Sequence, residues 1–449
     1  MVRPRGYPVS FARRVTKVGL GVYGFLVTDF ESEGLRAALA ASQEEIRRLR
    51  SVIASQSGGD GALIGPGFSG LRNYTGQACF LNAALQLLLH CPDLRQLADR
   101  LNKLDPLCNG FAWLLDCMWS GDYPVLVARR IYGCIERNFP VHDMTVKRKV
   151  KPVLHHDTHD VFVTLLNLLH KGSNTGKGGG VANNLYIPGN PNACNQGWAA
   201  LVEQESSPVI DIFGGLEGSI MRCSSCQMEQ MRLEYINTLV VPMVPHGQTQ
   251  CERGPLTLGK CLRYMTHEEN IDDWTGCSCQ EGRPVQATKK LILMKLPRVL
   301  VIQLKRFRLN AQGTGTVKLF NRVEIPLEGL SLDSIMPEDR RGQGVYDLTG
   351  VIRHRGNAHS GHYIADVLID GAWFQFDDEV VTPIEQPSCG GVKRFYPYVL
   401  MYRMRDNVAL LKEEGLKEGQ DEEKDDEDSL DLNFSFAIEP VERKRKTNK

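Results

Sequence analysis

Three side chains of this sequence have the types that nucleophilic catalysis requires, and the first is Cys79. A loop rich in Gly, Asn and Thr, residues 70–77, precedes it, and an apolar run, Phe80 to Leu89, follows. The run predicts a helix that is apolar on nearly every side and must therefore be buried. Cys79 would begin this helix, where unpaired backbone N–H groups and the helix dipole favour a thiolate. The alternative is that Cys79 is an ordinary core residue.

A nucleophilic thiol also needs a base and a group that orients the base. Residues 351–378 read VIRHRGNAHSGHYIADVLIDGAWFQFDD, which predicts three strands, the last two joined by a tight Asp-Gly turn. In this hairpin His362 begins one strand and Asp377 ends its antiparallel neighbour, so the two side chains can meet. We predict that Cys79 is the nucleophile, His362 the general base and Asp377 the orienting carboxylate.

Neighbouring residues leave two alternatives open. His359 competes with His362 for the role of base, because it is the same residue type only three positions earlier in the sequence. Asp378 is either a second orienting group or an ordinary turn carboxylate.

Composition divides the chain into three parts. Residues 1–62 begin basic and continue into a predicted amphipathic helix and linker; we expect a disordered leader here, although a transit peptide has a similar composition. Residues 67–405 show helical runs first and strand-like runs later, which predicts an α+β domain. Within it, 171–196 is rich in Gly and Asn and is interpreted as a surface insertion. Residues 406–449 form an acidic tail, predicted to be disordered because its like charges repel.

Charge and cysteine content exclude several classes of function. The 53 Lys and Arg residues balance 53 Asp and Glu residues, which removes the electrostatic basis for general nucleic-acid binding. The sequence contains no apolar run of about 18 residues that would span a bilayer. Thirteen cysteines, an odd number in a large chain, favour reduced thiols in the cytoplasm or nucleus. A basic cluster, RKRK at 443–446, is a candidate nuclear localisation signal.

Six motifs, in order, resemble those of the ubiquitin-specific protease family. GLRNYTGQACFLNAALQ resembles the cysteine box of this family, HHDTHDVFVTLLNLL its second box, and HSGHYIADV followed by WFQFDDEVV its histidine box. LTLGKCLRYMTHEEN, then LPRVLVIQLKRF with KLFNRVEIPLEGLSL, and finally YPYVLMYRM complete the set. The resemblance runs from Gly70 to Met404.

This resemblance implies a papain-like architecture of thumb, palm and fingers. Cys79 would begin a mostly helical thumb, a palm sheet would carry His362 and Asp377, and residues 223–279 would form the fingers. The implied activity is thiol-dependent hydrolysis of the isopeptide bond after the C-terminal Gly of ubiquitin or a ubiquitin-like modifier. No cofactor is implied for the chemistry, and we expect a monomer.

The sequence departs from the family pattern in its cysteine box. The Asn of the family that donates to the oxyanion lies five residues before the cysteine, whereas Asn73 lies six before Cys79. Loss of one oxyanion donor costs about a hundred- to a thousandfold in rate, so a misplaced Asn73 would favour a catalytically weak scaffold that binds ubiquitin-like folds. Gln77 or the Cys79 N–H is an alternative donor.

The second box also differs, because two histidines replace the usual Gln-Gln. This stretch is closer to the family member that removes an interferon-induced ubiquitin-like modifier, which gives an alternative specificity and a role in interferon signalling. His155, His156 and His159 are also a candidate metal site, although solvated or substrate-facing histidines are the simpler interpretation.

Four cysteines in two close pairs predict a structural zinc site in the fingers. Cys223 and Cys226 form a CxxC pair, and Cys277 and Cys279 form a tighter CxC pair. Four thiolates in two pairs suit tetrahedral zinc, which would hold the finger tips together and take no part in catalysis. Elsewhere in the domain, Arg306 is predicted to be a structural cation in the sheet. Four aromatic residues are predicted to belong to the palm core: Trp373, Phe374, Phe307 and Tyr398.

Overall fold

The computed structural model describes residues 63, 65–138, 156–176, 185–186, 193–245, 256–280, 283–310, 314–357, 360–388 and 394–406. The leader and its amphipathic helix lie outside the described residues, as does the acidic tail beyond 406. The chain divides after Arg405 into two units, and all elements described here belong to the first. No helix in the described ranges is long and apolar enough to cross a membrane.

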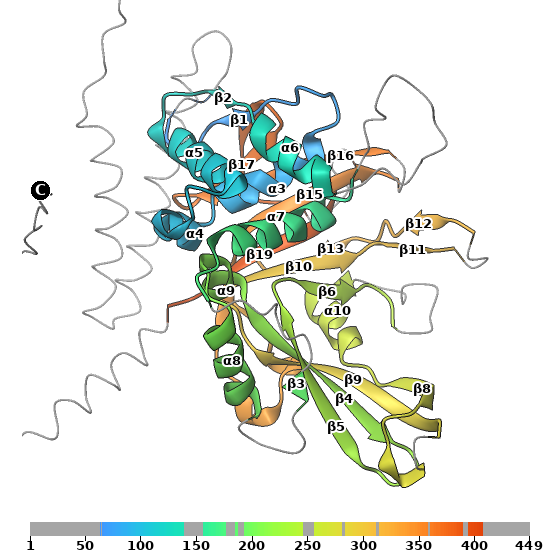
Figure 1. Ribbon diagram of the computed structural model, residues 1–449. Coiled ribbons are helices and arrows are strands. Elements are labelled where there is room, and N and C mark those ends of the chain that lie inside the picture. Colours follow the sequence, from blue (N-terminus) through green and yellow to red (C-terminus); the bar gives the residue numbers. More distant parts are fainter. Residues whose placement is uncertain are drawn as a thin grey trace, which may run out of the picture. The chain divides into compact units, whose positions relative to one another are not determined.

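Most helices lie together at one end of this unit (Figure 1). Side-chain caps start several of them: Asp105 accepts hydrogen bonds from the N–H groups of Leu107 and Cys108, and Asp157 accepts one from His159. The helices are α3 (Cys79–Leu89), α4 (Pro92–Gln96), α5 (Pro106–Ser120), α6 (Arg129–Asn138), α7 (Thr158–Ser173), α8 (Ala193–Gln204), α9 (Pro208–Phe213) and α10 (Leu258–Met265), with short 3₁₀ turns at Ala98–Arg100, Ser278–Gln280, Asp333–Ile335 and Glu338–Arg340.

The main sheet is the palm, and its described strands run in the order β18-β17-β16-β15-β19-β10-β6, with β14 added beside β15. All neighbours are antiparallel except β10 and β6. The strands are β6 (Leu239–Pro242), β10 (Val299–Lys305), β14 (Leu330–Ser331), β15 (Val345–Gly356), β16 (Gly361–Ile369), β17 (Ala372–Asp377), β18 (Val380–Ile384) and β19 (Tyr396–Met404). The three strands predicted from residues 351–378 are therefore confirmed as parts of β15, β16 and β17.

A second sheet forms the fingers, which extend away from α3, α5, α6 and α7 (Figure 1). Its described order is β3-β5-β4-β9-β8. The strands are β3 (Leu185–Tyr186), β4 (Gly215–Cys223), β5 (Glu229–Ile236), β8 (Glu269–Trp274) and β9 (Val285–Lys295). Short pairs complete the described strands: β1 (Gly70–Leu71) with β2 (Val125–Leu126), β7 (Leu256–Thr257) with β13 (Val323–Glu324), and β11 (Phe307–Leu309) with β12 (Thr316–Lys318).

The insertion predicted over 171–196 is narrower than we expected. At its start α7 continues to Ser173, which is buried, and at its end α8 begins at Ala193, with Cys194 buried against the fingers sheet. Leu185 and Tyr186 pair with β5. The Gly- and Asn-rich composition gives no local signal for the end of α7, for β3 or for the start of α8. Residues far away in the sequence stabilise these elements.

The core has two main parts, one on each side of the palm sheet. Every residue of α3 is buried, as its all-round apolar pattern predicts, and this helix packs against β15, β16, β17 and α7. Burying one leucine side chain is worth about 1.5–3 kcal/mol, so α3 is anchored firmly against the palm. The other part packs α10 and its surroundings on the opposite side. The arrangement confirms the predicted α+β architecture of thumb, palm and fingers.

Two further predictions for the palm are confirmed. Arg306 is fully buried and donates to the backbone carbonyls of Pro397, Leu319 and Asn321, so it is a structural cation. The aromatic residues Trp373, Phe374 and Tyr398 are buried in the core, and Phe307 packs against it while partly exposed.

Candidate functional site

The structure brings the first residue of α3 to the open end of the β16–β17 hairpin. Cys79 is 4% exposed and begins α3, and His362 is the second residue of β16. Asp377 is the last residue of β17, and its Oδ1 lies 2.6 Å from Nε2 of His362. The turn between the strands has Asp370 and Gly371, both at positive φ, which fits a tight Asp-Gly hairpin.

The imidazole of His362 lies between a carboxylate and a thiol. The hydrogen bond to Asp377, and then a side-chain hydrogen bond with Cys79, raise the pKa of His362 to about 10. Because Nε2 is held by Asp377, Nδ1 is the ring nitrogen left for the thiol. Both partners favour the imidazolium, which is the protonation state that accompanies a thiolate. The three residues predicted from the sequence are thus side by side. His359 lies outside the described residues.

A carboxylate oxygen of Asp378 lies within 4.8 Å of a ring nitrogen of His362, and both of its carboxylate oxygens accept hydrogen bonds from amides. Its Oδ2 accepts a hydrogen bond from Nδ2 of Asn73 at 2.9 Å, and its Oδ1 accepts one from Nδ2 of Asn82 at 2.8 Å. Its backbone carbonyl accepts from the N–H of Leu71. The backbone of Asp378 is left-handed, with φ of 53°. One palm residue therefore holds the cysteine loop, α3 and β1 together.

The extra residue of the cysteine box is absorbed within the loop that precedes Cys79. The N–H of Gly76 donates to the carbonyl of Asn73, and Gly76 has φ of 75°, so a tight turn takes up the added length. The side-chain oxygen of Asn73 accepts from the N–H of Ala78 at 2.8 Å. The Asn73 amide is thus fixed at both ends: its nitrogen donates to Asp378, and its oxygen accepts from Ala78, the N-cap residue of α3.

The second box contacts the beginning of α3. Thr158 donates from its hydroxyl to the carbonyl of Phe80 at 2.7 Å, and the hydroxyl of Tyr398 donates to the carboxylate of Asp157. His156 packs edge-on against Phe80, whereas His159 is buried, bonds to Thr238 and has its pKa lowered to about 4 by burial. His155 lies outside the described residues. The two described histidines thus have separate partners.

A buried lysine lies next to the strand end that carries His362, and sequence reasoning missed it. Nζ of Lys318 lies 2.8 Å from Nδ1 of His354 and donates to the carbonyls of His354 and Gly356 at 3.1 and 3.2 Å. Burial lowers the pKa of Lys318 to about 8 and that of His354 to about 3. The neutral imidazole can therefore accept from the ammonium. Arg355 lies between His354 and Gly356 in β15, and it is the residue that pairs with His362 of β16.

The four predicted cysteine ligands converge at the tip of the fingers. Their sulfur atoms all lie within 4.8 Å of one another, with 3.7 Å between Cys223 and Cys279 and 3.4 Å between Cys226 and Cys277. A tetrahedron with Zn–S bonds of 2.3 Å has S···S edges of about 3.8 Å, so the cluster fits a single zinc ion. The second pair of ligands, Cys277 and Cys279, is joined through a 3₁₀ turn at Ser278–Gln280, which makes a tighter connection than in the CxxC pair.

A thiol that begins a buried helix and faces an imidazole–carboxylate pair on a sheet is the arrangement of the papain-like cysteine proteases. Comparison with known proteins narrows this class. Residues 69–402 match the model of the family described as ubiquitin carboxyl-terminal hydrolase, and the chain belongs to this family.

Individual relatives are moderately similar. The chain is 27% identical to mouse ubiquitin carboxyl-terminal hydrolase 21 over 375 residues, which cover 76% of the chain but 62% of the relative. It is 29% identical to human ubiquitin carboxyl-terminal hydrolase 2 over 357 residues, covering 75% of the chain and 55% of that protein. These relatives do not support the hint of specificity for the interferon-induced modifier.

Two solved structures have the same fold. The yeast SAGA DUBm aligns with a TM-score of 0.56 at 23% identity, over 76% of this chain and 69% of the other. A SAGA DUB module of Ubp8, Sgf11, Sus1 and Sgf73 bound to monoubiquitin aligns with the same TM-score and identity, over 76% and 70%. At this identity the similarity establishes the fold alone.

Proposed function

We propose that this protein is a thiol-dependent isopeptidase that removes ubiquitin or a ubiquitin-like modifier from other proteins. Membership of the family supports the reaction type, and one observation carries the proposal: Cys79, His362 and Asp377 meet in hydrogen-bonding contact although they come from the two ends of the domain. No cofactor takes part in this chemistry.

In the proposed reaction Cys79 attacks the carbonyl carbon of the C-terminal Gly of the modifier. The resulting oxyanion accepts hydrogen bonds from the remaining N–H of Asn73 and from the backbone N–H of Cys79. Imidazolium His362 then donates its proton to the departing lysine amine as the C–N bond breaks, which leaves a thioester on Cys79. Neutral His362 next takes a proton from water, and the hydroxide releases the modifier with a free carboxylate. Asp377 keeps the imidazole oriented throughout.

The test uses ubiquitin and the interferon-induced modifier, each with a thiol-reactive group at its C-terminus. We expect a covalent adduct with at least one of them, and its loss in Cys79→Ala. Hydrolysis of the same modifier joined to a fluorogenic amine should fall by at least a thousandfold in His362→Ala. An adduct that persists in Cys79→Ala would refute the assignment of the nucleophile.

A catalytically weak scaffold is the second candidate function. It is favoured by the use of the Asn73 amide to bind Asp378, which leaves a single N–H for an oxyanion. A chain that binds ubiquitin tightly, yet forms no adduct with either modifier, would support the scaffold. An adduct with the interferon-induced modifier alone would identify the narrower isopeptidase.

We also propose a structural zinc in the fingers, bound by Cys223, Cys226, Cys277 and Cys279, and a monomer that resides in the cytoplasm and nucleus. The eleven described cysteines without a disulfide agree with a reducing compartment. Fluorescence imaging with and without residues 443–446 tests the nuclear part, and light scattering tests the monomer.

A further inference from the structure

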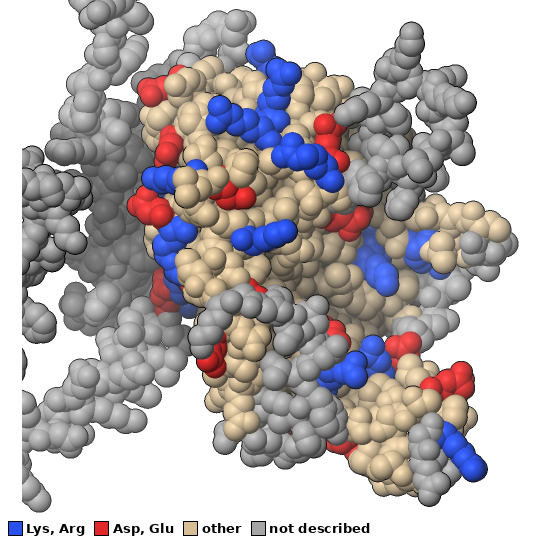
Figure 2. Space-filling view, in the orientation of Figure 1, with Lys and Arg blue, Asp and Glu red and all other residues tan. Residues whose placement is uncertain are grey.

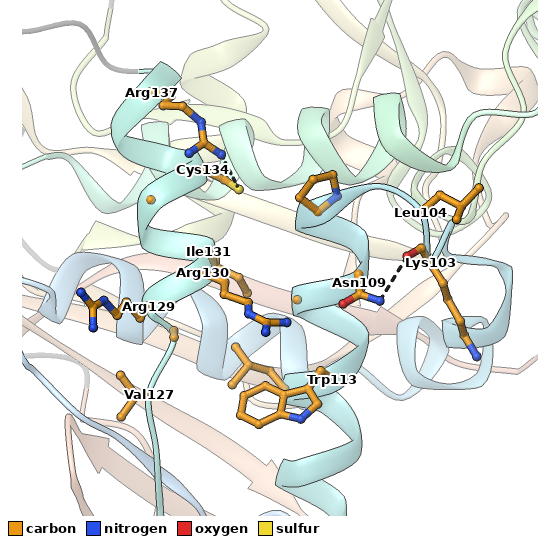
Figure 3. Close-up of a pocket in the computed structure, with 15 residues that line it drawn as sticks. Lys103, Leu104, Asn109, Trp113, Val127, Arg129, Arg130, Ile131, Cys134 and Arg137 are labelled. Carbon is orange, nitrogen blue, oxygen red and sulfur yellow. Dashed lines mark hydrogen bonds between the residues drawn. The ribbon is translucent and has the colours of Figure 1, made fainter.

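A groove of about 1020 Å³ lies between α5 and α6 (Figure 3). None of the residues placed in the candidate active site lines it. Its size is at the upper end of the range for ligand pockets. A groove this large between two helices can take several side chains of a polypeptide.

All the charged residues that line this groove are positive. Its lining includes the cations Lys103, Arg129, Arg130 and Arg137 and no acidic residue. All four are exposed, and none forms an ion pair with any residue in the part of the chain that the structure describes. Figure 2 shows Lys and Arg gathered on the surface over α6. In a chain with no net charge, this is a local site for a negatively charged partner.

Apolar side chains alternate with these cations. Leu104 is 93% exposed, Trp113 49% and Val127 38%, although all three are large hydrophobic residues. Figure 3 shows Trp113 on α5 opposite Arg130 and Ile131 on α6. An exposed aromatic residue beside arginines is the composition of an interaction hot spot. The groove therefore offers both apolar contact and positive charge.

We propose that the α5–α6 groove binds an acidic peptide segment of a partner protein, with a large apolar side chain of the segment against Trp113 and its carboxylates paired with Arg130 and the neighbouring cations. A nucleic acid fits less well. The apolar contacts come from Leu104, Val127 and a single Trp113, whereas single-stranded nucleic acids stack their bases on several aromatic residues. The proposal is independent of the isopeptidase activity, because it concerns a separate surface.

Position 133 permits a variant that fills the groove without removing any charge. Gly133 lies within α6 and lines the groove, and a Cβ atom at this position would meet nothing within 4 Å. Gly133→Ala should be tolerated, since Ala favours a helix by about 1 kcal/mol over Gly. Gly133→Trp places a bulky ring in the groove. Comparing Gly133→Trp with Gly133→Ala separates the effect of blocking the groove from the effect of removing a glycine from α6.

The experiment selects ligands for the full-length chain, purified as Cys79→Ala, from a random-peptide display library. An enriched peptide is then synthesised with a fluorophore and titrated against the variants. We expect enriched peptides with net negative charge and a large apolar residue, weakened at least tenfold by Arg130→Glu, by Trp113→Ala and by Gly133→Trp. Gly133→Ala should bind like the parent. So should Arg341→Glu, an exposed charge reversal outside the groove, at the residue that follows the 3₁₀ turn Glu338–Arg340.

Several results would overturn the proposal. These are enrichment of peptides without negative charge, binding that is unchanged by all three groove variants, or stronger binding of a labelled single-stranded oligonucleotide than of any peptide. Adduct formation between the modifier and Cys79 is measured separately, in groove variants that retain the cysteine, and should be unchanged by Gly133→Trp. Failure of the groove proposal is therefore distinguishable from failure of the proposed function.

Discussion

Asp378 should matter more to the reaction than its place in a surface turn suggests. Both of its carboxylate oxygens accept amide hydrogen bonds, one from Asn73 and one from Asn82, which is 3% exposed. In Asp378→Asn the side chain keeps its shape, and Asn tolerates the left-handed backbone. Its NH₂ group, however, must face one of the two amide donors. One hydrogen bond is lost, and the other loses its charged acceptor.

The magnitude follows from these contacts. A hydrogen bond to a charged group is worth about 1.5–3 kcal/mol, and the site is partly exposed, so we expect a loss of about 2 kcal/mol in the free energy of unfolding. If Asn73 is the oxyanion donor, its displacement should lower kcat by about ten- to a thousandfold with little change in KM, because the contact forms in the transition state.

The assay is hydrolysis of a fluorogenic ubiquitin amide, with stability measured by chemical denaturation. Asn73→Ala should lower kcat to a similar extent, and the double variant should be no worse than the more damaging single variant, since both act through one amide. Glu379→Gln is the neighbouring control, because Glu379 forms a half-exposed ion pair with Arg72 that is worth little. Independent, additive effects of the Asn73 and Asp378 variants would refute this reasoning.

Three further predictions test the surroundings of the site. Lys318→Met should lower kcat at least tenfold, because it leaves the buried carbonyls of the β15 end without a donor, whereas Lys305→Met, on the exposed side of β10, should not. The kcat/KM for hydrolysis should fall on the alkaline side near pH 10, because the imidazolium then loses the proton that it donates to the leaving amine. Asp377→Ala should move this limb to lower pH because it removes the main cause of the raised pKa; coincident limbs would contradict this. Purified protein should contain one zinc per chain by mass spectrometry, and Cys226→Ser should lower both metal content and thermal stability while the Cys79 adduct still forms.

Local pattern was sufficient to predict the elements that carry the chemistry. The run after Cys79 is apolar on every side, so only a buried helix accommodates it, and α3 is buried along its whole length. The alternation from Tyr363 onward and the Asp-Gly turn specify a hairpin whose register brings His362 near Asp377. Each of these inferences depends on residues that are close together in the sequence.

The contacts that position these elements relative to one another were not predictable in the same way. Lys318 and His354 belong to strands that no local periodicity relates, and a lysine between strands is ordinarily assigned to the surface. Asp378 follows Asp377 in the sequence, yet its partners lie in the other half of the domain. A carboxylate in a turn has no pattern of its own, so only the fold identifies which amides it accepts.

Contacts between residues far apart in the sequence are especially close where the thumb meets the palm. A Cβ atom at Gly70 would lie 2.3 Å from the carbonyl oxygen of Glu379, so the backbones of β1 and of the turn after β17 touch where only glycine fits. The next residue, Leu71, donates its N–H to the carbonyl of Asp378. These main-chain contacts fix the position of β1 against the turn after β17. Because the loop that contains Asn73 connects β1 to α3, they also help to position the first residue of α3. The position of the Cys79 thiol relative to the His362 imidazole thus depends on a glycine of the β1–β2 pair and on an aspartate in the turn after β17.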